Sequence, residues 1–148
     1  MKIEIRSATA QDFGFICQMI RQLNEVPQDG VLDDEKLENI FHTALKNPTK
    51  FYYLAEHFGK AVGFMSFLFD YQLSEIGYVL TIEELVIDEN FHRQGIGAKL
   101  IDFAVEFAKA RDCQVMQLTT NFRRIETHQF YESQGWDKNG YRFGLSLE

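Results

Sequence analysis

Residues 91–98 read Phe-His-Arg-Gln-Gly-Ile-Gly-Ala, and the interpretation of the whole chain starts from them. They follow a mostly apolar run at residues 82–87 that predicts a strand, and they open an amphipathic run that predicts a long helix. The first turn of a helix has backbone N–H groups without intrahelical acceptors and carries about half a positive charge. Gly95 and Gly97 leave room for a ligand to approach. We therefore expect a phosphate-bearing ligand at this turn.

Spacing excludes two common phosphate-binding motifs. A dinucleotide-binding turn requires a third glycine at position 100, where the chain has Leu100. An ATP-type loop requires Gly-Lys-Ser/Thr after a four-residue spacer, and the sequence has no such triplet. What remains is a Gly-x-Gly turn between a strand and a helix, a pattern that a turn without any ligand also produces.

Composition restricts the class of protein. A chain of 148 residues that is 45% hydrophobic and 14% aromatic is expected to fold as one domain over residues 1–148. Its net charge of −7 argues against a nucleic-acid or membrane-surface partner. Cys17 and Cys113 are too few for a disulfide framework or a cysteine metal site, and no metal is expected. No apolar run reaches about 18 residues and no signal-peptide pattern occurs, so we expect a soluble cytoplasmic protein.

Hydrophobic periodicity and turn residues predict the order of elements. Strands are expected at residues 2–6, 51–56, 61–69, 78–87 and 115–119, and helices at residues 13–26, 37–45, 97–111 and 125–134. Thr9 and Asp12 have the spacing of a capping box, and Asn139-Gly140 predicts a hairpin between two final strands. The order β-α-α-β-β-β-α-β-α-β-β predicts a mixed sheet with helices on its faces.

Two motifs placed in this order carry a family resemblance. The first is the turn at residues 92–98, and the second is Thr-His-Gln-Phe-Tyr-Glu-Ser-Gln-Gly-Trp at residues 127–136. With a strand between them, the chain resembles the GNAT superfamily of acetyl-CoA-dependent N-acetyltransferases over essentially its whole length. The resemblance implies an α/β fold with a mixed, mostly antiparallel sheet of about six to seven strands flanked by about four helices. The first motif begins with His92 where the family usually has Arg or Gln, which leaves open whether His92 or Arg93 contacts a phosphate.

The resemblance also implies acetyl-CoA as co-substrate and residues that bind it. The diphosphate is expected on the backbone amides of the turn, and the pantetheine arm is expected to pair with the end of the preceding strand. Asn121 is a candidate contact to the pantetheine, although turns favour Asn in any case. The expected cofactor-binding residues are Leu85, Val86, Ile87, His92, Arg93, Gln94, Gly95, Ile96, Gly97, Ala98, Asn121 and Tyr131.

Acetyl transfer to an amine requires an acid for the departing thiolate and a base for the amine. Tyr131 matches the family's acid, and a phenol with a pKa near 10 stays protonated beside a thiolate whose pKa is near 8.5. Glu83 and Glu84 lie beside the expected acetyl slot and are the candidates for the base, with a water relay as a third route. We prefer Glu83 because it matches the position from which some family members supply the base.

The activity implied by the resemblance is transfer of an acetyl group to a primary amine of a small molecule or protein by direct attack. The segments expected to face the acceptor are acidic, which favours a cationic amine. The resemblance also implies a homodimer. The alternative is a non-catalytic acetyl-CoA-binding sensor or assembly module, but binding alone requires neither Tyr131 nor a strand glutamate. The acidic residues are Glu25, Asp29, Asp33, Asp34, Glu35 and Glu75.

Overall fold

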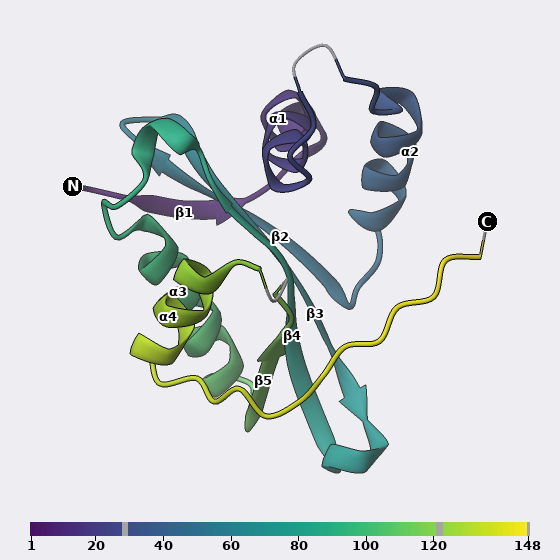
Figure 1. Cartoon of the computed structure of the whole chain (residues 1–148), viewed down its shortest axis with the longest axis vertical. Coiled ribbons are helices and arrows are strands. Elements are labelled where there is room, and N and C mark those ends of the chain that lie inside the picture. Colours follow the sequence, from purple (N-terminus) through teal and green to yellow (C-terminus); the bar gives the residue numbers. More distant parts are fainter. Residues whose placement is uncertain (28–29, 121–122, 148) are drawn as a thin grey trace. The chain divides into compact units, whose positions relative to one another are not determined.

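The computed structural model describes residues 1–27, 30–120 and 123–147. Internal contacts divide the chain into two units, Met1–Gln117 and Leu118–Glu148, and each is described by itself. Figure 1 shows the chain with its helices and strands labelled. Asp29 and Asn121 lie outside the described residues.

The sheet has the strand order β1-β2-β3-β4-β5. Neighbouring strands from β1 to β4 are antiparallel, and β2 and β3 form a hairpin at Gly59, whose φ of 75° suits glycine. The sequence of β3 is apolar at almost every position, which is typical of a strand covered on both faces, and its residues 62–67 are buried. The strands are β1 Glu4–Ser7, β2 Lys50–His57, β3 Lys60–Gln72, β4 Gly77–Ile87 and β5 Val115–Leu118.

Four α-helices and three short 3-10 turns complete the described chain. The α-helices begin and end within about three residues of the positions that periodicity and capping signals predicted. At the start of α2, for example, the Asp33 carboxylate accepts a hydrogen bond of 3.0 Å from the Lys36 amide. The α-helices are α1 Phe13–Leu23, α2 Asp34–Ala44, α3 Ile96–Lys109 and α4 Ile125–Ser133, and the turns are η1 Ala10–Asp12, η2 Leu73–Glu75 and η3 Glu89–Phe91.

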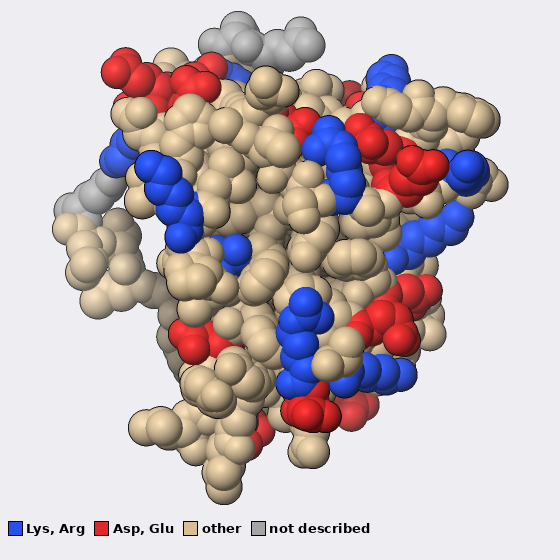
Figure 2. Space-filling model, turned by 180° about the vertical axis from the view of Figure 1, so that it is seen from behind, with Lys and Arg blue, Asp and Glu red and all other residues tan. Residues whose placement is uncertain are grey.

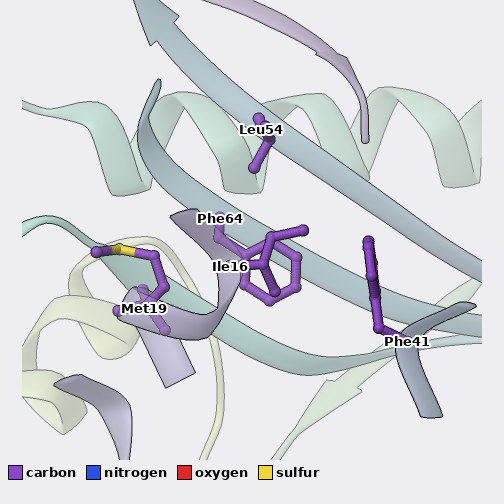
Figure 3. Close-up of a cluster of buried hydrophobic side chains, with 6 residues drawn as sticks. Ile16, Met19, Phe41, Leu54 and Phe64 are labelled. Carbon is purple, nitrogen blue, oxygen red and sulfur yellow. The ribbon is translucent and has the colours of Figure 1, made fainter. Parts of the chain in front are cut away.

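Hydrophobic side chains hold helices against both faces of the sheet in the first unit. On one face, a cluster of buried residues joins α1 and α2 to β2, β3 and β4 (Figure 3). On the other face, α3 brings Phe107 within 4.9 Å of the Phe67 ring and of the Phe51 ring, measured between centroids. The face under α1 and α2 is the one that matters for the site. Its cluster consists of Ile16, Met19, Phe41, Leu54, Phe64 and Val86.

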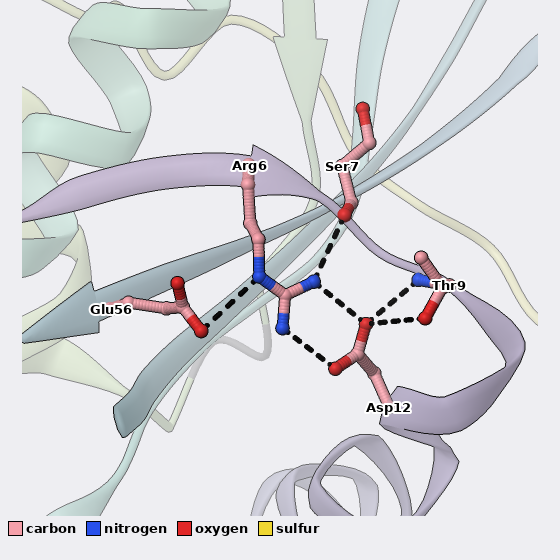
Figure 4. A network of polar contacts seen from close by, with 5 residues as sticks. All are labelled: Arg6, Ser7, Thr9, Asp12 and Glu56. Carbon is pink, nitrogen blue, oxygen red and sulfur yellow. Dashed lines mark hydrogen bonds and ion pairs between the residues drawn. The ribbon is translucent and has the colours of Figure 1, made fainter. Parts of the chain in front are cut away.

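A polar network fastens β1 to the start of α1 and to β2 (Figure 4). The Arg6 guanidinium bonds both oxygens of Asp12, at 2.9 and 2.8 Å, and lies 3.2 Å from Glu56. Asp12 also accepts the Thr9 backbone N–H at 2.7 Å, which confirms the expected pairing of Thr9 with Asp12. The Arg6 hydrogen bonds lower the pKa of Asp12 to about 2, against an opposing effect of burial.

The final hairpin predicted from Asn139-Gly140 is absent, because residues 136–147 contain no strand. The described sheet therefore has five strands, fewer than the six or seven expected. The turn signal is local, whereas a two-stranded hairpin is stable only when it packs against further apolar surface. Three large apolar side chains after the turn are almost fully exposed: Tyr141 is 93% exposed, Phe143 93% and Leu145 86%.

Candidate active site

The most distinctive backbone feature of the sheet is a β-bulge in β4. Ser66 of β3 lies opposite Glu84 and the next residue, Phe67, lies opposite Ile82, so Glu83 has no partner across the ladder. An extra residue of this kind bends its strand and changes the direction of the neighbouring side chains. The bulge therefore places the adjacent residues Glu83 and Glu84 in different surroundings.

Glu84 lies in a row of polar side chains across three strands. The register places Tyr52 opposite Ser66 and Ser66 opposite Glu84, on the face that also carries Leu54, Phe64 and Val86. The Ser66 hydroxyl, which is 1% exposed, donates a short hydrogen bond to the Glu84 carboxylate. Burial raises the pKa of Glu84, while the Ser66 hydrogen bond opposes that rise. Burial and the nearby Glu84 and Glu83 raise the pKa of Tyr52 to about 12.

Glu83 has a different environment. Its carboxylate is paired with the Lys50 ammonium at 2.7 Å, and the two side chains are about 30% exposed. The pair links the first residue of β2 to the bulge of β4. Glu83 is thus held by a cation at the surface, whereas Glu84 is a half-buried carboxylate.

Two hollows open beside these residues. The larger, of about 650 Å³, follows α2 and the turn after it, and the smaller, of about 260 Å³, lies against the start of β2. Both are lined by Asn47 and Lys50, and Tyr52 lines the smaller one. A volume of several hundred cubic ångströms suits a small organic ligand. The described chain therefore has space for an acceptor in contact with Lys50 and Tyr52.

The turn before α3 has the geometry that its sequence predicted for an anion site. Gly95 is the N-cap of α3 with a φ of 78°, and a Cβ added there would meet nothing within 4 Å. No described side chain caps this helix, so the first-turn amides of Ile96, Gly97 and Ala98 are available to a ligand. Arg93, exposed in the same turn, also has a positive φ of 62°. These features fit the diphosphate of a nucleotide-like cofactor.

Two side chains, those of Gln22 and His92, form hydrogen bonds with backbone atoms at the end of β4 and just after it. Gln22 of α1 donates to the Ile87 carbonyl at 2.7 Å and accepts the Glu89 amide at 3.1 Å. The His92 ring nitrogen Nε2 lies 2.8 Å from the same Ile87 carbonyl, which makes it the protonated ring nitrogen. His92 therefore helps to shape the turn.

Tyr131 lies in α4, within the second unit. Its ring packs 5.7 Å from the Trp136 ring and 5.2 Å from the Phe130 ring, centroid to centroid. Burial raises the pKa of Tyr131 to about 12. The phenol consequently stays protonated throughout the pH range in which proteins work.

The two cysteines lie inside the protein. Cys17 and Cys113 are free and buried, and burial raises the pKa of Cys17, which makes it a poor nucleophile. Among the described residues, no group of three or more His, Cys, Asp or Glu side chains is arranged to hold a metal ion. No helix in the described ranges is both long and apolar enough to cross a bilayer.

Sequence reasoning singled out the glutamates, the turn and the aromatic motif, and it did not point to several residues that surround them. Lys50 and Ser66 were not predicted, because they reach the glutamates only through strand pairing over 33 and 18 residues. Gln22 was missed for the same reason, since its partners are 65 and 67 residues away. A polar serine inside the apolar run of β3 was the one signal that could have been used.

Comparison with known proteins identifies the class to which this fold and site belong. The model of the acetyltransferase (GNAT) family matches residues 17–136. The chain is 30% identical over 148 residues to the aminoalkylphosphonate N-acetyltransferase of Salmonella typhimurium, covering 97% of this chain and 91% of that protein. It is 28% identical over 134 residues to an uncharacterized N-acetyltransferase of Archaeoglobus fulgidus, covering 89% and 91%. A solved structure of a transcriptional regulator from Bacillus halodurans C-125 has a TM-score of 0.83 at 26% identity, covering 99% of this chain and 100% of that one.

The chain belongs to the acetyltransferase (GNAT) family. It is an acyltransferase that moves an acetyl group to an amine, and the family implies acetyl-CoA as the co-substrate. The resemblance drawn from residues 92–98 and 127–136 is thereby confirmed.

Proposed function

We propose that the protein acetylates the primary amine of a small aminoalkyl compound, with Glu84 as the base and Tyr131 at the leaving group. The observation that carries this proposal is the half-buried Glu84 carboxylate at the β4 bulge, which accepts a hydrogen bond from Ser66 and whose row includes Tyr52, a residue that lines the smaller hollow. Sequence reasoning preferred Glu83, but its carboxylate is neutralised by Lys50. A base with a raised pKa is better matched to an amine than an ordinary glutamate.

The proposed reaction is a direct attack. The amine nitrogen forms a bond to the thioester carbonyl carbon, the carbon–sulfur bond breaks, and the proton lost by the amine goes to Glu84. Full proton transfer from a phenol with a pKa of about 12 to a thiolate with a pKa near 8.5 is uphill by roughly 3 to 4 pKa units. Tyr131 is therefore proposed to donate a hydrogen bond to the departing sulfur, which takes its proton finally from water.

The cofactor is proposed to bind along the end of β4 and the start of α3. The amides of residues 94–98 hold the diphosphate, and the backbone of Leu85, Val86 and Ile87 pairs with the pantetheine arm. His92 and Gln22 support this arrangement by fixing the Ile87 carbonyl. Arg93 supplies a positive charge at the turn. Asn121 stays a sequence prediction, because it lies outside the described residues.

The proposed acceptor class comes from the relative in Salmonella typhimurium. That protein is named an aminoalkylphosphonate N-acetyltransferase, and it is 30% identical to this chain over 148 residues. A wholly cationic acceptor, which the acidic residues suggested, has less support. Asp34 is paired with Arg21 at 3.0 Å, and Figure 2 shows acidic and basic side chains interspersed over the face in view.

Replacing Glu84 tests this proposal. Glu84→Gln should lower kcat/KM for thiol release from acetyl-CoA by about 100- to 10,000-fold, because general-base catalysis is lost. The wild-type rate should fall as pH drops through the raised pKa of Glu84, and the variant should lose this dependence. The raised pKa also means that the Glu84 charge opposes folding at neutral pH, so the variant should have a higher Tm. Thiol release assays over pH 5 to 9 and thermal unfolding check both outcomes.

Glu83→Gln is the matched control, because it makes the same change from carboxylate to amide at the neighbouring residue. It should keep the fall in rate at low pH that the wild-type protein shows. If Glu83→Gln abolishes this fall and Glu84→Gln retains it, Glu83 is the base.

We also propose that the protein works as a homodimer, as the family resemblance implies. Four apolar side chains of the C-terminal segment, at positions 141, 143, 145 and 147, are each at least 86% exposed and would be covered by a second copy. Light scattering that gives the mass of one chain would contradict this. The cytoplasmic location remains a prediction.

A further inference from the structure

The larger hollow joins the proposed reaction site at one positively charged residue, Lys50. This hollow follows α2, and Lys36 and Lys50 supply positive charge to its wall. Lys50 is also the residue whose ammonium lies 2.7 Å from Glu83 at the bulge. A ligand in the hollow can therefore contact Lys50, which lies beside the bulge.

The neighbours of Lys50 favour binding of an oxyanion. The side-chain oxygen of Asn47 already accepts the backbone N–H and the hydroxyl of Thr49, at 2.9 and 2.8 Å. Its NH₂ group is thus the part that can donate to a ligand. Of the two acidic residues on the wall, Asp33 is used as the cap of α2, and Glu35 lies at the N-terminal turn of that helix.

We propose that Lys50, with the Asn47 amide, binds an anionic group of the acceptor and so selects amines that carry a phosphonate, sulfonate or carboxylate a few bonds from the nitrogen. This inference rests on the proposed function and adds a specificity residue to it. Without an acceptor, Glu83 neutralises the Lys50 charge. When an acceptor binds, its anionic group replaces Glu83 at the ammonium, while the amine end of the molecule reaches Glu84.

The test compares acceptors that differ only in their second group. The probes are 2-aminoethylphosphonate, 2-aminoethylsulfonate, β-alanine, neutral ethanolamine and the polycation spermidine, each assayed by thiol release from acetyl-CoA. Lys50→Met keeps the apolar stem and removes the charge. It should lower kcat/KM for the anionic acceptors by about 10- to 100-fold relative to kcat/KM for ethanolamine, the effect of losing one charge-assisted hydrogen bond. Lys50 also lowers the pKa of Glu84, but that effect is shared by all acceptors and leaves the ratio unchanged.

Two further single variants separate this role from general effects on the fold. Lys50→Arg retains the charge and should retain most of the preference for anionic acceptors. Lys46→Met removes an exposed lysine from the same connection between α2 and β2 that lines neither hollow, and it should change no acceptor. Equal losses for ethanolamine and the anionic acceptors in Lys50→Met would overturn the proposal.

A double variant distinguishes direct contact between Lys50 and the acceptor from an indirect effect of the Glu83 charge. Lys50→Met also leaves Glu83 uncompensated, and a free carboxylate would repel an anion. In Lys50→Met/Glu83→Gln both charges are gone, so the loss should persist if Lys50 contacts the anion. Recovery of the preference would overturn the inference. If wild-type protein acetylates only ethanolamine or spermidine, the anion site is wrong but the activity stands; if no amine releases thiol, the proposed function itself fails.

Discussion

At the scale of single residues, environment separates side chains that look alike in the sequence. Glu83 and Glu84 are adjacent, yet one is paired with a surface lysine and the other is bonded to a buried serine. Burial raises the pKa of Glu84 because the charged form loses its hydration. Asp12 shows the reverse case, since Arg6 stabilises the charged form and lowers the pKa of Asp12. One carboxylate is suited to catalysis and the other to stability.

The Asp12 pair makes a prediction about stability and pH. Because the folded pKa of Asp12 is about 2, below the unfolded value of about 4, its contribution is complete above pH 4 and disappears as pH falls through 2. Asp12→Asn should therefore cost about 1–2 kcal/mol at pH 7, a figure reduced for the 39% exposure of Arg6, and much less near pH 2. Urea unfolding at several pH values measures this difference. Asp102→Asn, at an exposed position of α3, should change little at any pH.

At the scale of elements, local signals predicted the helices well. Helix α3 was expected over residues 97–111 and runs Ile96–Lys109, because apolar periodicity and a glycine cap are properties of the segment itself. The bulge at Glu83 was not predictable, because it is defined by the register between β3 and β4. The same limit explains the missing final hairpin, where Asn139-Gly140 gave a turn signal but the strands lack a packing partner.

The turn before α3 makes a prediction at this scale. Gly95→Ala should destabilise the fold by about 1–2 kcal/mol, because an alanine is strained at a φ of 78°. Its Cβ would also project into the open space where a phosphate approaches, so the rise in Tm caused by acetyl-CoA should shrink. Gly14→Ala is the matched control: Gly14 lies exposed in α1 with nothing within 4 Å of its added Cβ, and this change should stabilise the protein by about 0.5–1 kcal/mol. Thermal unfolding with and without acetyl-CoA measures both effects. If Gly95→Ala and Gly14→Ala gave the same change in Tm and the same response to acetyl-CoA, the proposed role of Gly95 would be wrong.

At the scale of the larger unit, the core under α1 and α2 supports the polar row of the site. Phe64 is 1% exposed and lies two residues before Ser66 on the same face of β3. Phe64→Ala should cost about 3–5 kcal/mol, because it removes a ring and leaves a cavity among packed side chains. Leu73→Ala, at a position 95% exposed, should cost less than about 0.5 kcal/mol. Urea unfolding of the two variants measures this contrast, and similar costs would show that the described core is wrong.

We propose that the first turn of α3 and the end of β4 together hold acetyl-CoA. The most direct measurement is a titration of isotope-labelled protein with coenzyme A, following each backbone amide by NMR. The largest shifts should fall on the amides of Ile96, Gly97 and Ala98 and on those of Leu85, Val86 and Ile87. If these amides stay unchanged while those along α2 shift, coenzyme A binds elsewhere and the account is wrong.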